Sequence, residues 1–172
     1  MALHDDQLAA IADVAAIGAP VWLRGGWAMD FFLGRITREH RDVDFFAWAA
    51  DAPRIIEKIT AMGYALLPEP PHDQQLDFLR DGVDLSFALV DRDEAGHVVV
   101  AGGPWAGERW PDGMLDGPAA TLGGIRFAVV DPYAQMEIKR RMPEWVPGLP
   151  RRPKDAEDVA RLAAALGVVA TD

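Results

Sequence analysis

Two aspartates one residue apart are the first candidates for chemistry in this 172-residue chain. Asp42 and Asp44 stand at the start of an apolar run that is typical of a β-strand. Side chains alternate along a strand, so both carboxylates point to one face, with Cα atoms about 6–7 Å apart. Two like charges held this close repel each other, and hard cations prefer oxygen ligands. The pair therefore predicts a Mg²⁺ site.

Two glycines upstream suit the other half of a phosphate site. Gly25 and Gly26 follow a short apolar run at 21–23 and precede an apolar helical pattern at 27–33. Glycine lets the backbone approach a ligand closely, and the N–H groups of a helix N-terminus favour an anion. A lone Asp-x-Asp often just flanks an exposed strand, and a lone Gly-Gly is usually a turn. Their order, strand then glycines then helix then Asp-x-Asp, is what indicates a site.

This stretch resembles the nucleotidyltransferases of the DNA polymerase β superfamily, and is most similar to the aminoglycoside 2″-nucleotidyltransferases, which are adenylyltransferases. Their signature reads GGWA-x-D, then LGR-x-TR-x-H, then D-x-D. It is matched by Gly25–Asp30, Leu33–His40 and Asp42–Asp44. The strong resemblance covers residues 21–48, and a weaker one continues to residue 90. Gly-Gly replaces the Gly-Ser of many superfamily members, and the spacer before D-x-D is long, as in the antibiotic-modifying branch.

The resemblance implies an enzyme that transfers AMP from ATP to a hydroxyl of a small molecule and releases pyrophosphate. The implied acceptor is an aminoglycoside-type antibiotic, so the implied role is antibiotic resistance. Asp42 and Asp44 would bind two Mg²⁺ ions. A third carboxylate in a Val-Asp-Leu context completes the metal triad of the family, and Asp84 matches it. Asp84 would also be able to accept the proton of the attacking hydroxyl.

Four residues are expected around the nucleotide phosphates of such an enzyme. Gly25 and Gly26 would cradle the phosphates through backbone N–H groups. Arg38 and His40 stand just before the metal strand and would reach the phosphates from there. A second possible role for this Arg and His is to close the loop over the preceding helix.

The sequence leaves the roles of several residues, and of the chain itself, open. The alternative to a metal role for Asp84 is an ordinary ion pair on an exposed face. Asp81 is the nearby alternative to Asp84 as third carboxylate, but it belongs to a turn. Trp105 and Trp110 would either line an acceptor pocket or pack over the edge of the sheet. The alternative function for the whole chain is a nucleotide-binding module without turnover, or an enzyme that modifies a protein partner as toxin–antitoxin components do.

Composition narrows the class of protein. Asp and Glu number 27 against 17 Lys and Arg, which gives a net charge of −10 and argues against nucleic acid as a partner. An acidic chain attracts a cationic small-molecule acceptor. There is no cysteine, hence no disulfide or thiolate zinc site. No apolar run has the ~20 residues that span a membrane, and the acidic N-terminus does not resemble a signal peptide, so we expect a cytoplasmic protein.

Periodicity and turn residues predict the elements that position these side chains. We expect a single domain over residues 1–172, of the α/β or α+β class, with helices packed on a mixed sheet. The resemblance specifies the polymerase-β-like nucleotidyltransferase core. Helices are expected at 5–17, 27–33, 51–62 with Asp51 as its cap, 131–142 and 154–166. Strands are expected at 20–23, 41–48, 64–67, 97–101 and 125–130, and a hairpin joins 76–80 to 83–90 through Asp81-Gly82.

Overall fold

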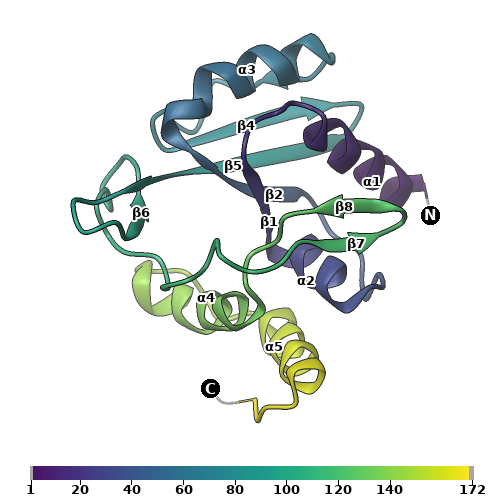
Figure 1. Ribbon diagram of the computed structural model, residues 1–172, viewed down its shortest axis with the longest axis vertical. Helices are drawn as coiled ribbons and strands as arrows, with labels where there is room; N and C mark the ends of the chain where they lie inside the picture. The colour runs from purple at the N-terminus through teal and green to yellow at the C-terminus, as the bar shows by residue number, and fades with distance from the viewer. Residues whose placement is uncertain (1, 171–172) are drawn as a thin grey trace.

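The computed structural model of the chain describes residues 2–170 as helices packed on a mixed β-sheet (Figure 1). Its elements, in chain order, are α1 (Ala2–Ala15), β1 (Val21–Arg24), α2 (Gly25–Leu33), β2 (Val43–Trp48), η1 (Ala49–Asp51), α3 (Ala52–Ala61), β3 (Ala65–Leu66), β4 (Gln75–Arg80), β5 (Val83–Arg92), β6 (Val98–Val100), β7 (Ala120–Leu122), β8 (Ile125–Phe127), α4 (Pro132–Trp145) and α5 (Pro153–Leu166).

Six strands form the main sheet within this part of the chain, in the order β1-β2-β5-β4-β3, with β6 paired to the end of β5. Strands β2 and β5 run parallel, and the other pairs are antiparallel. The mixed sheet confirms the α+β class. Strand β2, which follows Asp42, therefore lies between β1 and β5 inside the sheet.

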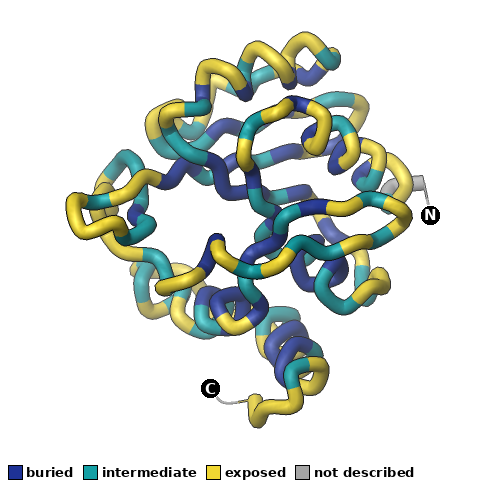
Figure 2. The backbone as a smooth tube through the Cα atoms, in the orientation of Figure 1, coloured by how far each residue is buried: buried dark blue, intermediate teal, exposed yellow. Residues whose placement is uncertain are grey.

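One face of the sheet is the main core. Alternate residues of β2 and β5, such as Phe45 and Phe87, are fully buried and stack with ring centroids 4.8 Å apart. Helices α1 and α3 cover this face with apolar residues that include Ile11 and Ile55. Figure 2 shows the buried backbone concentrated in the central strands. Because side chains alternate, this burial turns the intervening residues of β2 and β5 to the opposite face.

The opposite face is covered at one end only. Phe46 and Val90 pack there against Ile138 of α4. Helix α5 packs beside α4 and α2 through a smaller cluster that includes Met29, Met136 and Leu162. The other end of this face carries the aspartates and stays open, so the topology leaves a site where the sequence predicts one.

The structure corrects several predicted elements. Helix α2 begins at Gly25, so the two glycines are its first residues and not a turn before it. Asp51 makes no capping hydrogen bond to α3, because a 3₁₀ turn precedes that helix. A second, two-stranded sheet of β7 and β8 was not predicted. Helix α4 continues through Pro143 to Trp145.

No helix within residues 2–170 is long and apolar enough to cross a membrane.

Candidate active site

Asp42 and Asp44 lie next to each other at the start of β2. Val43 between them is fully buried, which directs the side chain of Asp44 to the open face of the sheet. Burial raises the pKa of Asp44 to about 6; the nearby charge of Asp42 and a hydrogen bond to Asp42 act in the same direction, while Arg24 opposes them. The two carboxylates repel each other in a partly desolvated position. A bound cation would relieve that repulsion.

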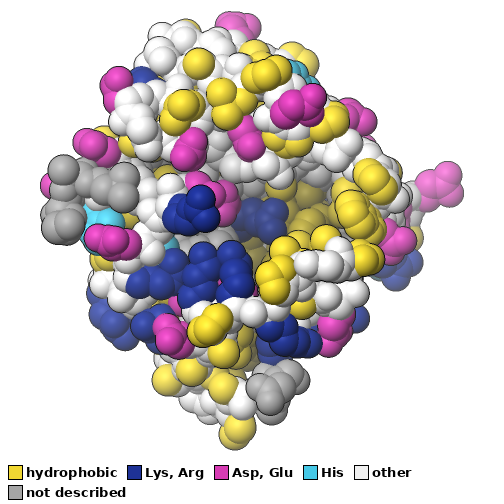
Figure 3. Space-filling view, turned by 180° about the vertical axis from the view of Figure 1, so that it is seen from behind, with side chains coloured by type: hydrophobic (Ala, Val, Ile, Leu, Met, Phe, Trp, Pro, Cys, Tyr) yellow, Lys and Arg dark blue, Asp and Glu magenta, His cyan; other side chains and the backbone are white. Residues whose placement is uncertain are grey.

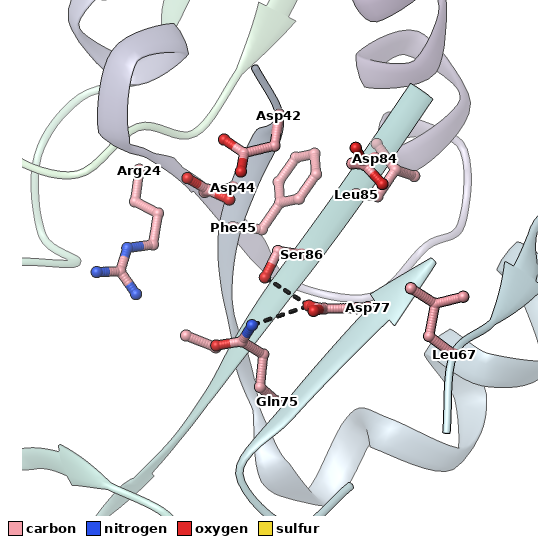
Figure 4. Close-up of a pocket in the computed structure, with 11 residues that line it drawn as sticks. Arg24, Asp42, Asp44, Phe45, Leu67, Gln75, Asp77, Asp84, Leu85 and Ser86 are labelled. Atoms are coloured by element: carbon pink, nitrogen blue, oxygen red, sulfur yellow. Dashed lines mark hydrogen bonds between the residues drawn. The ribbon is translucent and has the colours of Figure 1, made fainter. Parts of the chain in front are cut away.

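Strands β4 and β5 add two more carboxylates to the same face. Asp44 is the cross-strand neighbour of Ser86, which is in turn the neighbour of Asp77. Ser86 Oγ donates a hydrogen bond to Asp77 Oδ1 at 2.8 Å, and Gln75 Nε2 donates to the same oxygen at 2.9 Å. Asp84 is exposed and lies two residues before Ser86 on β5. These side chains form one polar row across three strands (Figure 4).

A cavity of about 340 Å³ joins the four aspartates, Asp42, Asp44, Asp77 and Asp84. Although Asp84 is largely exposed, its pKa is raised, first by partial burial and then by the charges of Asp42 and Asp77, while Arg41 opposes the shift. The charge of Asp42, one of the two predicted metal ligands, thus acts on Asp84. Asp77 was not predicted from the sequence, because its only signal is its place on the polar side of a hairpin strand.

The carboxylates of Asp42 and Asp44 are ligands of the kind that Mg²⁺ prefers. Within residues 2–170 no three acidic or histidine side chains converge closely enough to form an ion site. Asp42 and Asp44 nevertheless offer oxygen ligands, and their mutual repulsion favours a divalent cation between them. The assignment of Asp84 as a third ligand stays a prediction.

The two glycines border a second, basic pocket of about 210 Å³. Gly25 has φ +67°, and a Cβ there would lie 3.3 Å from Asp44 Oδ2. A Cβ on Gly26 would collide with the imidazole of His40. Five cationic side chains line the pocket, from Arg38, Arg41, Lys139, Arg152 and Lys154. Figure 3 shows Lys and Arg gathered around a hollow on this face, so an acidic chain presents a basic pocket beside its acid pair.

His40 and Arg38 line this pocket and are also held by internal partners. His40 is buried, and its Nε2 atom lies 2.5 Å from Asp30 Oδ2. Arg38 Nε and Nη2 donate to the two carboxylate oxygens of Asp158 at 3.1 and 2.7 Å. The second predicted role, in which they close the loop over α2, therefore has direct contacts in the structure. Their contact with phosphate stays a prediction.

These contacts explain why the signature residues stand at their spacing. Asp30 accepts a hydrogen bond from Thr37 Oγ1 at 2.6 Å as well as from His40. The amide of Gln7 donates to the carbonyl of His40 at 2.9 Å, and its oxygen accepts from Trp27 Nε1 at 3.2 Å. The Trp, Asp, Thr and His of the signature thus fix the loop that leads into Asp42.

A third cavity, of about 600 Å³, continues from the first through Arg24, Gln75 and Ala88. Trp105 and Trp110 both line it, and Trp110 also packs on Phe46 of the sheet, so both expected placements have contacts in the structure. That an acceptor binds there stays a prediction. Arg24 was not predicted as a site residue. Its guanidinium carbon lies 4.1 Å from the centroid of Phe46, and Asp44 is its cross-strand neighbour.

Comparison with known proteins supplies the family. The family model for aminoglycoside-2''-adenylyltransferase matches residues 7–113, which is more than half of the chain. The chain belongs to the aminoglycoside-2''-adenylyltransferase family. A lincosamide resistance protein of Staphylococcus haemolyticus is 40% identical over 45 residues, which cover 26% of this chain and 28% of the relative. A 2''-aminoglycoside nucleotidyltransferase of Klebsiella pneumoniae is 50% identical over 38 residues, 22% of this chain and 20% of the relative.

Solved structures confirm the nucleotidyltransferase fold of this adenylyltransferase family member. The lincosamide antibiotic adenylyltransferase LnuA, in a lincomycin-bound crystal structure, superposes with a TM-score of 0.70 at 19% identity and covers 92% of this chain and 96% of its own. The curated relatives are matched over less than a third of their lengths. Family and fold are therefore established for this chain.

Proposed function

We propose that the chain is a Mg²⁺-dependent nucleotidyltransferase that transfers AMP from ATP to a hydroxyl of a small antibiotic-type acceptor. One observation carries the proposal: Asp42 and Asp44 stand between a basic pocket and a cavity that leads to an aromatic one. A triphosphate suits the basic pocket, and an organic acceptor suits the aromatic cavity. The reacting atoms would then meet at the carboxylates. The names of two relatives, a lincosamide resistance protein and a 2''-aminoglycoside nucleotidyltransferase, support the acceptor class.

The proposed reaction forms one bond and breaks one. The acceptor oxygen attacks the α-phosphorus, and the bond between that phosphorus and the oxygen bridging to the β-phosphate breaks, so pyrophosphate leaves. Asp42 and Asp44 would hold Mg²⁺, which supplies electrostatic stabilisation to the attacking and leaving oxygens. The hydroxyl proton passes to Asp84, whose raised pKa makes it a better base than an ordinary aspartate.

The basic pocket would orient the leaving pyrophosphate. Gly25 and Gly26 lie at the N-terminus of α2, where backbone N–H groups favour anions. Lys154 and Arg152 come from the start of α5, far away in sequence. The pKa of Lys154 is lowered, first by burial and then by the charges of Arg152 and Arg38. Crowded cations of this kind favour a polyanionic ligand, because it relieves their repulsion.

The test is a pyrophosphate-release assay with ATP, Mg²⁺ and a panel of aminoglycosides and lincosamides, with mass spectrometry of each drug. We expect at least one drug to gain the mass of an adenylyl group. Asp44→Asn, which keeps the shape of the side chain, is the matched inactive control. Nucleotide binding without any modified drug would refute the proposed transfer to antibiotics.

A further inference from the structure

The cavity beyond the aspartates has an aromatic wall. Trp110 packs edge-on against Phe46 and Trp145, with ring centroids 4.9 and 6.2 Å apart. Trp105 is 44% exposed on the same cavity, which Met142 also lines. The loop that carries Trp105 and Trp110 is held to β6 by backbone hydrogen bonds, including Trp110 N to Val98 O at 2.9 Å. The wall is thus built into the fold and presents flat apolar surfaces to a ligand.

The charged groups on this cavity are mostly cationic. Arg24 and Arg109 line it, and Glu108 is its one carboxylate among the lining residues. Arg109 faces Asp93 at 3.8 Å and is largely exposed. Arg24 lies at the junction with the aspartate cavity, stacked over Phe46 and 5.3 Å from the centroid of Trp110.

The position of Arg24 separates the carboxylates from the aromatic wall. Arg24 lines both cavities and Asp44 is its cross-strand neighbour, so an ammonium group placed at this junction would be repelled by the guanidinium. Like charges repel most strongly where water is excluded. Ammonium groups that lie along the aromatic wall would find one carboxylate among its lining residues, Glu108, so a molecule with several of them there would leave most unpaired at a desolvation cost.

The other polar groups can serve an uncharged ligand. Gln74 and Gln75 line the cavity with amide groups, which both donate and accept hydrogen bonds. The indole N–H of Trp110 is buried and has no acceptor among the described residues. Amides and a guanidinium suit carbonyl and hydroxyl oxygens. They give a polycation little to bind.

We propose that this cavity binds the acceptor, and that the acceptor is a hydroxyl-bearing molecule with an apolar body and at most one positive charge, not a polycation. The inference rests on the proposed nucleotidyl transfer, whose acceptor it specifies. Within the family it places this chain with enzymes that modify lipophilic antibiotics, although the composition by itself favours a cationic acceptor.

Direct binding tests the inference apart from turnover. Lincomycin, a monocation, chloramphenicol, a neutral hydroxylated aromatic compound, and tobramycin, a polycation, are titrated calorimetrically into the protein with Mg²⁺ and a non-hydrolysable ATP analogue. We expect lincomycin or chloramphenicol to bind at least about tenfold more tightly than tobramycin. Raising the salt from about 0.05 to about 0.5 M should change that affinity little, because charge attraction contributes little to it.

Two variants locate the binding. Trp145→Ala and the more exposed Trp105→Ala should each weaken binding of the preferred compound by about tenfold, because each removes aromatic contact area. Tyr133→Ala is the control, since Tyr133 is 53% exposed and lines none of the three cavities. Trp105→Ala is the safer variant for folding, because its ring is not part of the core.

The outcomes separate the two proposals. The inference is overturned if tobramycin binds as tightly as lincomycin or chloramphenicol, or if neither lincomycin nor chloramphenicol binds. The proposed nucleotidyl transfer would still hold in that case if tobramycin gains an adenylyl group. If lincomycin or chloramphenicol binds at the Trp wall and no compound is modified with ATP, the inference holds and the transfer fails. Unchanged affinity in both Trp variants overturns the assignment of the cavity.

Discussion

The Nε2 atom of His40 lies 2.5 Å from Oδ2 of Asp30, and the two side chains are only 3% and 0% exposed. Arg38 Nη1 lies 3.1 Å from the other ring nitrogen, Nδ1. Arginine can only donate, so Nδ1 is the acceptor, and Nε2 carries the hydrogen that it donates to Asp30. The hydrogen bond between His40 and Asp30 ties the loop just before Asp42 and Asp44 to helix α2.

Asp30→Asn should therefore act through the fold. The change weakens a buried hydrogen bond from His40 and a partly buried one from Thr37, and leaves an amide where a carboxylate was. We expect the free energy of unfolding to fall by about 2 kcal/mol. Urea denaturation measures it, and Asp6→Asn on the exposed side of α1 is the matched control. Full stability together with a raised KM for ATP would show that His40 serves the phosphates instead.

The signature shows how much of the site can be derived from sequence. The spacing of Asp42 and Asp44 was sufficient to predict their common location, because alternation along a strand is local geometry. The hairpin through Asp81-Gly82 was predicted and is confirmed, with Asp81 at φ 50° in its turn. Local turn chemistry and strand periodicity carried both predictions.

Asp44 gives a pH prediction for the metal-free protein. Its folded pKa is about 6, above the ordinary 3.8, so the folded state holds a proton that the unfolded state loses between those values. This contribution to stability is fully present below pH 4 and is lost as the pH rises through 6. Asp44→Asn has no charge to bury. In chelator it should be more stable than the parent at pH 7 by about 2 kcal/mol.

That difference should vanish near pH 4, and thermal unfolding of both proteins across the range measures it. The same variant should lose nearly all pyrophosphate release. A parent protein that gains stability over this window relative to Asp44→Asn would mean that Arg24 outweighs burial at this carboxylate. Turnover near the parent rate in the variant would remove Asp44 from the metal pair.

Other site residues depend on tertiary structure that no local pattern specifies. Arg24 lines both the aspartate cavity and the aromatic cavity because β1 pairs with β2 and because the loop after β6 brings Trp110 near it. Asp77 reaches the site through the register of β4 on β5. Each case needs a long-range pairing, which a single sequence does not reveal.

Three variants separate the carboxylates of the hairpin. Asp84→Asn should lower kcat by about 10²–10⁴-fold if Asp84 takes the proton of the acceptor. Asp81→Ala should leave kcat near the parent value and cost about 1 kcal/mol of stability, because alanine tolerates the left-handed turn position poorly. Single-turnover kinetics and denaturation measure the two effects. If Asp77→Asn abolishes turnover and Asp84→Asn does not, the base lies on β4.

Lys154 tests the phosphate role of the basic pocket. Its side chain lines the pocket with Gly25 and Gly26, and its pKa is lowered first by burial and then by neighbouring cations. Lys154→Gln removes one charge from a group that we expect to hold the triphosphate, so ATP should bind about tenfold more weakly. Lys58→Gln on the exposed side of α3 is the matched control and should leave the affinity unchanged. The affinity for ATP should also fall more steeply with salt in the parent than in Lys154→Gln. The variant has one charge contact fewer for salt to screen. Equal affinities and equal salt dependence in the parent and Lys154→Gln would place the triphosphate outside this pocket.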